Sequence, residues 1–413
     1  MMHDRQSDMA SDRRPAQAYE LVTRAQRMMA TEVSVQLAVE PERIAEARAA
    51  VAECFAWFAE IEQRLSRFQP TSELCALNRS AGSWFAASET LYTAVFMAIQ
   101  EAHASDGLFN PGLLHRLEAL GYDRDFSLLS REPAAAHAPA QTSPQTSPVD
   151  LWKGVIFDTA RRRIRLPAGA ALDLGGIAKG WAADVAMERY CLPFPGALIN
   201  VGGDMRLRGG PQPGRSWTIG LRDPRDPAEA QSNPNMAPDV TPGASAEEIW
   251  NRATVTFSRG ALATSGAARR WWHANGERYH HLLDPRTGQP LPLWTSDDAG
   301  SDVDRRGWEP LIASVTALAP TGAQAEVATK VALARGYARA LAEVEEAWAR
   351  WGAVGPHGAC DAGVALIFTL SDGRVIYSAN LAAWLDAWGT HAAPLPMILN
   401  TQGAQPLTLG TLG

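Results

Sequence analysis

The order of strand-like and helix-like segments constrains the fold of this chain more than any other feature. Short strand patterns follow one another, and few of them are separated by a run of helical periodicity. A doubly wound parallel sheet would require strands and helices to alternate regularly, so we expect a mixed α+β fold. We expect strands at 32–39, 151–158, 163–166, 197–208, 216–222, 253–257, 279–283, 312–319, 364–370 and 374–378. Helices are expected at 41–67, 88–104, 177–191, 322–336 and 338–351.

Two stretches show neither pattern. Residues 131–148 are rich in Pro, Ala, Ser, Thr and Gln, and a similar stretch covers about 223–246. Both are expected to be surface inserts, since the segments that suggest chemistry fall on either side of each. Residues 1–24 are expected to be a disordered leader and residues 396–413 a tail, which leaves 25–395 as a single domain.

Charge and composition exclude several classes of function. The net charge is −7 and no Lys/Arg-rich run occurs, so we expect neither nucleic-acid binding nor attraction to an anionic membrane. No uncharged apolar stretch reaches about 18 residues, and the first residues are polar, so we expect no membrane insertion, no secretory signal and a cytoplasmic location. The four cysteines are scattered and form no C-x-x-C pair, which favours reduced thiols over zinc or a disulfide framework.

A strand that meets paired glycines and then a helix is the first segment with chemical meaning. It runs from Leu172 to Asp184, with the glycines at 175 and 176. Glycines let a ligand approach the backbone, and free N–H groups at a helix start suit a phosphate. Lys179 would add positive charge there. The segment matches neither the P-loop nor the Rossmann glycine pattern, and a plain strand–turn–helix with a solvated lysine is equally compatible with it.

Three further segments allow a structural and a functional interpretation. Residues 198–207 break at Gly202-Gly203, which indicates a bulge or hairpin, or backbone that lines a pocket. His280 and His281 end a strand, so their side chains point to opposite faces and only one can face a site, as a structural histidine or as a general base. Glu326 and Lys330 are spaced i,i+4 on a helix, a pair worth about 0.3–0.5 kcal/mol when exposed.

The order of these segments is more specific than any of them alone. Asp-Leu-Gly-Gly-Ile-Ala-Lys-Gly (173–180), Asn-Val-Gly-Gly-Asp (200–204), Ala-Thr-Ser-Gly (263–266), His-Leu-Leu-Asp-Pro-Arg-Thr-Gly (281–288) and Ser-Val-Thr-Ala-Leu-Ala-Pro (314–320) follow in turn. In this, the chain resembles the ApbE family of FAD:protein FMN transferases from about Met28 to about residue 380. The resemblance implies an α+β fold of mixed sheets with flanking helices and an FAD cleft. A divalent cation, usually Mg²⁺, would sit on the pyrophosphate.

The resemblance also implies a reaction and a set of residues. The hydroxyl of a Ser or Thr in an acceptor protein would attack the phosphorus of FMN, and AMP would leave. His281 would be the catalytic base, with Lys179 as a second catalytic group. The carbonyl of Gly176 and the carboxylate of Glu326 would be metal ligands. The positions that would contact FAD are Met29, Phe68, Leu108, Phe109, Asn110, Asp173, Lys179 and Leu282.

The chain departs from the family pattern at three positions. Ala30 follows Met29 where the family has Gly, and Asn110 stands where the family usually has Asp. On the metal helix, the family has an Asp and a Thr one turn apart, whereas this chain has Glu326 and Lys330. A protonated lysine cannot ligate a cation. Thr329 could replace the missing ligand only if the helix were shifted.

These departures leave three alternatives for the metal and three for the function. The ammonium of Lys330 could occupy the position of the metal, the metal could remain on Glu326 and backbone oxygens, or transfer could be lost. The favoured function is FMN transfer to an acceptor protein. The alternatives are a non-catalytic FAD-binding protein and a hydrolase that converts FAD into FMN and AMP. No stretch of this chain resembles an acceptor motif, so we do not expect it to modify itself.

Overall fold

The computed structural model describes residues 19–129, 149–225, 253–274, 276–295, 310–344, 363–385 and 387–389. The expected insert at 131–148, most of the insert at 223–246 and the tail at 396–413 lie outside these ranges. None of the helices in the described ranges is both long and apolar enough to cross a bilayer.

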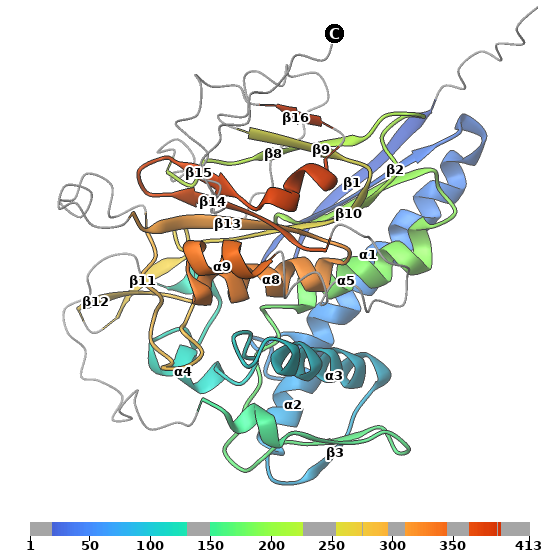
Figure 1. Ribbon diagram of the computed structural model, residues 1–413. Helices are drawn as coiled ribbons and strands as arrows, with labels where there is room; N and C mark the ends of the chain where they lie inside the picture. Colours follow the sequence, from blue (N-terminus) through green and yellow to red (C-terminus); the bar gives the residue numbers. More distant parts are fainter. Residues whose placement is uncertain are drawn as a thin grey trace, which may run out of the picture.

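An antiparallel sheet of eight strands forms the centre of the molecule (Figure 1). Its spatial order is β1-β2-β6-β7-β10-β13-β14-β15, so the chain leaves the sheet and returns to it several times. The strands are β1 (Glu20–Met28), β2 (Thr31–Val39), β6 (Gly196–Val201), β7 (Asp204–Arg208), β10 (Arg259–Ser265), β13 (Ile312–Ala319), β14 (Ala365–Leu370) and β15 (Val375–Tyr377).

The two faces of this sheet are covered by different elements. Helices α1 (Ile44–Leu65), α5 (Ala178–Ala186) and α8 (Gly322–Arg335) lie on one face, and a small sheet lies on the other (Figure 1). Alternate side chains of β6 point to opposite faces of the sheet. Ile199 lies in the core between the sheet and the helices, and Leu198 lies in the core between the two sheets. The small sheet consists of β16 (Ala387–Gly389), β9 (Ala253–Phe257) and β8 (Trp217–Leu221), in that order.

A second lobe follows α1 and lies beyond the helical layer (Figure 1). It contains α2 (Glu73–Arg79), α3 (Glu89–Ala104), α4 (Leu114–Ala119) and a sheet of β3 (Trp84–Ala86), β5 (Arg163–Arg165) and β4 (Ile156–Asp158). The other elements within the described ranges are the hairpin of β11 (Trp271–Ala274) and β12 (Glu277–His280), helix α9 (Tyr337–Val344), and the short helices η1 (Pro41–Arg43), η2 (Phe126–Leu128), η3 (Leu151–Gly154), η4 (Met187–Cys191) and η8 (Ala379–Ala383).

The mixed α+β class is confirmed, and three local expectations are wrong. The strand expected at 279–283 is β12, which ends at His280 and leaves His281 outside it. Strand β1 begins at Glu20, inside the expected leader at 1–24. Nearly all its side chains are exposed, so no alternation marks the strand, and pairing with β2 forms it instead. Residues 151–154 form a 3₁₀ turn rather than the start of a strand at 151–158, because Trp152 turns into the core and Lys153 N–H donates to the Asp150 carbonyl.

Three of the four cysteines lie in the described ranges, and all three are free thiols. Cys54 and Cys191 are buried with their Sγ atoms 3.8 Å apart, whereas Cys75 is partly buried. No disulfide joins any two of these three, and the expectation of reduced thiols stays a prediction.

Candidate active site

A pocket of about 620 Å³ opens where several turns at one end of the central sheet face the second lobe. This volume is in the range of about 300–1,000 Å³ that is common for cofactor sites. Every residue that the sequence singled out for the site lines this pocket, as does Lys330. They are Met29, Phe68, Leu108, Phe109, Asn110, Asp173, Gly176, Lys179, His281, Leu282 and Glu326.

Helices α5 and α8 cross with their backbones in contact, and this crossing fixes the charged part of the pocket. A Cβ at Gly180 would lie 2.2 Å from the Gly322 carbonyl oxygen, so no larger residue fits there. The carboxylate of Asp184 on α5 accepts the N–H groups of Gly322 and Ala323 at the start of α8, at 2.7 and 3.0 Å. The Gly180 N–H in turn donates to Glu326 Oε2 at 2.9 Å.

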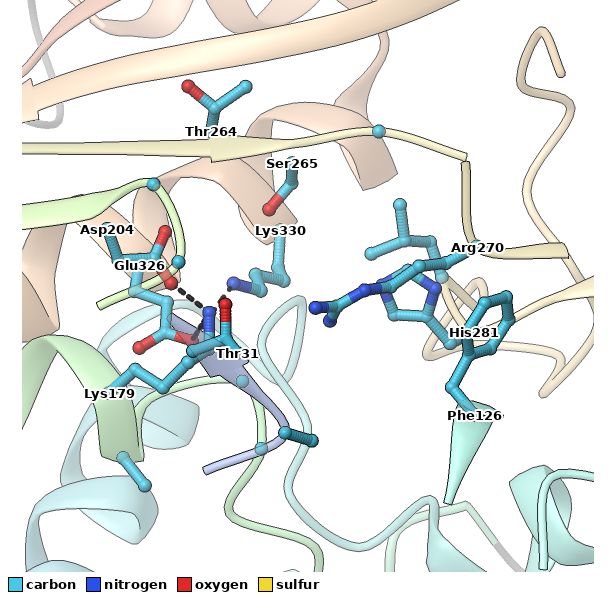
Figure 2. A pocket seen from close by; sticks show the side chains of 18 of the residues that line it. Thr31, Phe126, Lys179, Asp204, Thr264, Ser265, Arg270, His281, Glu326 and Lys330 are labelled. Carbon is cyan, nitrogen blue, oxygen red and sulfur yellow. Dashed lines mark hydrogen bonds and ion pairs between the residues drawn. The ribbon is translucent and has the colours of Figure 1, made fainter. Parts of the chain in front are cut away.

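Two lysines and two carboxylates form a buried charge cluster at this crossing (Figure 2). Lys179 pairs closely with Asp204, and its Nζ lies 3.6 Å from Glu326 Oε1. Lys330 Nζ lies 3.5 Å from the same oxygen, so the predicted i,i+4 pair is present, although Glu326 is fully buried. Burial lowers the pKa of Lys330, whereas Asp204 and Glu326 outweigh burial and raise the pKa of Lys179.

Asp204 is a member of the cluster that the sequence analysis did not assign. It follows Gly202 and Gly203, whose φ angles of +68° and +101° turn the chain from β6 into β7. The Gly-Gly break is therefore a hairpin, and it places an acid beside Lys179. The feature of the sequence that could have indicated this residue is its position directly after the glycine pair.

His281 lies across the pocket from this cluster, beside Arg270 (Figure 2). The two histidines point apart as expected, since the His280 ring lies 2.9 Å from the Leu291 carbonyl while His281 lines the pocket. Burial, reinforced by the positive charge of Arg270, holds the pKa of His281 well below its usual range. Its Nδ1 is buried and has no hydrogen-bond partner among the described residues. A neutral imidazole with an unpaired nitrogen can accept a proton.

Arg270 was also missed by the sequence analysis. It lines the pocket, and its guanidinium extends from beside His281 toward the lysines (Figure 2). The available signal was the pair Arg269-Arg270 shortly after the Ala-Thr-Ser-Gly segment.

The turn between β1 and β2 forms one edge of the pocket. Met29 and Ala30 both have positive φ, +52° and +55°, and the paired residues on either side are Met28 and Thr31. Such a two-residue turn favours glycine or asparagine. The Gly that the family has at position 30 would suit this conformation, and Ala30 adopts it at a cost.

An arginine and two aromatic rings form the wall beside Asp173. The Arg67 guanidinium lies over the rings of Phe68 and Tyr122, 4.1 and 4.3 Å from their centres, and its Nε is 3.3 Å from Asp173 Oδ2. Asp173 Oδ1 also accepts the Gly175 N–H at 2.8 Å. Arg67 and Tyr122 were not predicted as site residues. The stacking fixes the orientation of the Asp173 carboxylate at the pocket edge.

The side chain of Asn110 holds the loop around it in place. Its Oδ1 accepts the Gly112 N–H at 2.8 Å, and its Nδ2 donates to the Val149 carbonyl at 2.7 Å. An aspartate could make the first bond but not the second. The bond to Val149 therefore requires the amide donor of an asparagine. Leu108 and Phe109, just before it, are buried against the core.

The oxygen donors at the cluster do not fit a divalent cation. No group of three or more His, Cys, Asp or Glu in the described part of the chain could hold a metal. Magnesium requires octahedral oxygen ligands. Both carboxylates are already paired with ammonium groups. The alternative ligand, Thr329, is fully buried, and its hydroxyl donates to the Glu326 carbonyl and contacts Ser265 Oγ, each at 2.7 Å.

Solved structures with similar folds include an ApbE protein and a flavinyl transferase. An ApbE protein of Thermotoga maritima superposes with a TM-score of 0.65 at 21% identity, over 90% of this chain and 100% of that one. The flavinyl transferase ApbE of Pseudomonas stutzeri, in its apo form, gives a TM-score of 0.63 at 20% identity, over 89% of this chain and 98% of that one. At these identities the likeness concerns the fold.

Sequence comparison gives the family. The FAD:protein FMN transferase of Treponema pallidum (strain Nichols) is 29% identical over 314 residues, which cover 73% of this chain and 75% of that protein. The one of Klebsiella pneumoniae (strain 342) is 30% identical over 240 residues, 56% of this chain and 63% of that protein. The sequence model of the ApbE family matches residues 29–351, well over half of the chain. The chain therefore belongs to the ApbE family.

Proposed function

We propose that this protein transfers FMN from FAD to a Ser or Thr hydroxyl of an acceptor protein and releases AMP. One observation carries the proposal: a single pocket holds a charge cluster on one side and, on the other, a neutral histidine whose Nδ1 has no hydrogen-bond partner among the described residues. Its relatives from Treponema and Klebsiella are named FAD:protein FMN transferases, which supports the same substrate.

The reaction can be written with this chain's own residues. The acceptor hydroxyl attacks the phosphorus of the FMN half, a new P–O bond forms, and the P–O bond to AMP breaks. His281 accepts the hydroxyl proton, and AMP leaves with the additional negative charge. Lys179 lies where it can stabilise that charge. Because the donor set does not fit a metal, no step is assigned to one. The Mg²⁺ site that the sequence predicts on Gly176 and Glu326 is not favoured by these donors. The cytoplasmic location stays a prediction from the sequence.

Assay of AMP release tests the function. The full chain is incubated with FAD and an acceptor protein that a related transferase modifies, with the Ser/Thr→Ala acceptor as control. We expect AMP together with covalently bound flavin, seen as in-gel fluorescence and as an added mass of FMN on the acceptor. AMP with free FMN would instead identify an FAD hydrolase. Bound FAD without AMP would identify a non-catalytic binding protein.

A further inference from the structure

The end of the Lys330 side chain fills the space between Glu326 and Gly176. Its Nζ lies 3.5 Å from Glu326 Oε1. A Cβ built on Gly176 would lie 3.7 Å from Lys330 Cε, so the lysine passes directly over the backbone of this glycine. Glu326 and Gly176 are the two positions expected from the sequence to ligate a metal. The lysine therefore occupies the volume that such an ion would need.

One oxygen of the Glu326 carboxylate accepts a hydrogen bond, and the other lies between two ammonium groups without a hydrogen bond among the described residues. Its Oε2 accepts the Gly180 N–H, and its Oε1 lies between Lys179 Nζ at 3.6 Å and Lys330 Nζ at 3.5 Å. A dication bound to Oε1 would lie within a few ångströms of both ammonium groups, and in a partly buried site this repulsion is poorly screened. Because two ammonium groups already balance the two carboxylates, the cluster has no excess negative charge to hold a divalent cation, and it is also short of ligands.

The same cluster suits an anion. Lys330 and Lys179 both line the pocket, and each keeps about a fifth of its side-chain surface exposed, 22% and 21%. Their charges balance Asp204 and Glu326, and Arg270 reaches in from the other side of the pocket (Figure 2). An ammonium is a compact donor that binds phosphate oxygens as a point charge.

We propose that the ammonium groups of Lys330 and Lys179 bind the pyrophosphate of FAD in place of a divalent cation, so that flavin binding by this protein needs no metal. This inference rests on the proposed function, because it takes FAD as the ligand. The Nζ atoms donate to the non-bridging oxygens of the pyrophosphate, while Glu326 and Asp204 hold the lysines in position. When AMP leaves, the charge that develops on its phosphate meets the same donors.

Calorimetric titration of FAD tests the inference on the full chain. The EDTA-treated protein is titrated with FAD in EDTA and again with magnesium chloride. We expect the two dissociation constants to agree within about twofold, which is a difference of less than one RT in binding free energy. Titration with Mn²⁺ alone should show no binding.

Variants at position 330 separate a charge role from a structural one. Lys330→Thr removes the ammonium and places an oxygen donor one turn from Glu326. In EDTA it should bind FAD about 10- to 100-fold more weakly, and magnesium should restore most of the loss. Lys330→Met should bind FAD as weakly as Lys330→Thr in EDTA, and magnesium should not restore its affinity. The FAD affinity of Lys330→Arg should be the same with and without magnesium. Lys153→Thr, at an exposed lysine that does not line the pocket, is the matched control and should behave as wild type.

Distinct outcomes would overturn the two proposals. A wild-type protein whose FAD affinity falls tenfold in EDTA and recovers with magnesium would overturn the inference and leave FMN transfer intact. The inference also fails if Lys330→Met binds FAD as tightly as wild type. Absence of FAD binding under both conditions would overturn the inference and the proposed function together. Magnesium-independent binding without AMP release would contradict the transfer alone.

Discussion

His281 and Lys330 face each other across the pocket, and the charges around them act on their pKa values in opposite directions. Burial lowers the pKa of both His281 and Lys330. For His281 the neighbouring charges are mostly positive, so they lower its pKa further. For Lys330, Glu326 and Asp204 act in the opposite direction and favour the charged form. The pocket thus provides a neutral base on one side and donors for an anion on the other.

Replacement of His281 tests the base directly. His281→Ala should reduce the rate of AMP release about 10²- to 10⁴-fold, the usual contribution of a positioned general base. The dissociation constant of FAD should change little, because His281 lies apart from the charge cluster. Calorimetry and a single-turnover assay give the two values. An unchanged rate would assign the proton to another group, and His115→Ala, at an exposed histidine, is the control.

The lowered pKa of His281 also predicts how stability depends on pH. Below the ordinary value of 6.5, the unfolded chain takes up a proton at this residue that the folded chain does not. The free energy of unfolding should therefore decrease as the pH falls below about 6.5. Urea unfolding should show a smaller decrease for His281→Gln than for wild type, and His115→Gln should match wild type. Equal slopes for all three proteins would show that His281 titrates normally.

Among the elements, the turn at Met29-Ala30 carries backbone strain. A non-glycine residue in the left-handed region costs about 1–2 kcal/mol. Glycine avoids this strain but loses more conformational entropy on folding, which offsets part of the gain. Ala30→Gly should therefore stabilise the protein by about 0.5–1 kcal/mol. Ala56→Gly, on the exposed face of α1, is the matched control and should destabilise by about 1 kcal/mol. Thermal or urea unfolding measures both. A destabilised Ala30→Gly would mean that the turn is not strained.

The elements also show where reasoning from sequence succeeds and where it stops. Helix α1 and strand β13 have strong apolar patterns and were predicted close to their observed bounds. Strand β1 was missed because its residues carry no such pattern, and its partner β2 determines its conformation. The site residues came from short motifs that the family resemblance linked. Arg67 and Arg270 were missed: Arg270 closely follows the Ala-Thr-Ser-Gly segment, but only the fold shows that both side chains reach the pocket.

On the scale of the whole molecule, the pocket joins parts of the chain that are far apart in sequence. Ligand binding to such a site should stabilise the fold globally. At about 100 times its dissociation constant, FAD should add about 2.7 kcal/mol to the free energy of unfolding and raise the melting temperature. Hydrogen exchange should slow at residues 108–110, 173–179 and 281–283 together. Protection of only one of these segments would contradict a shared site.

The spread of the pocket along the chain has a consequence for biosynthesis. Its walls extend from Met29 in the first turn to Leu333 in α8, so about three hundred residues separate the first wall residue from the last. A nascent chain that ends before α8 has neither Glu326 nor Lys330. Such a chain lacks this part of the proposed flavin site, so we expect FAD to bind only after α8 has been synthesised and has packed against α5.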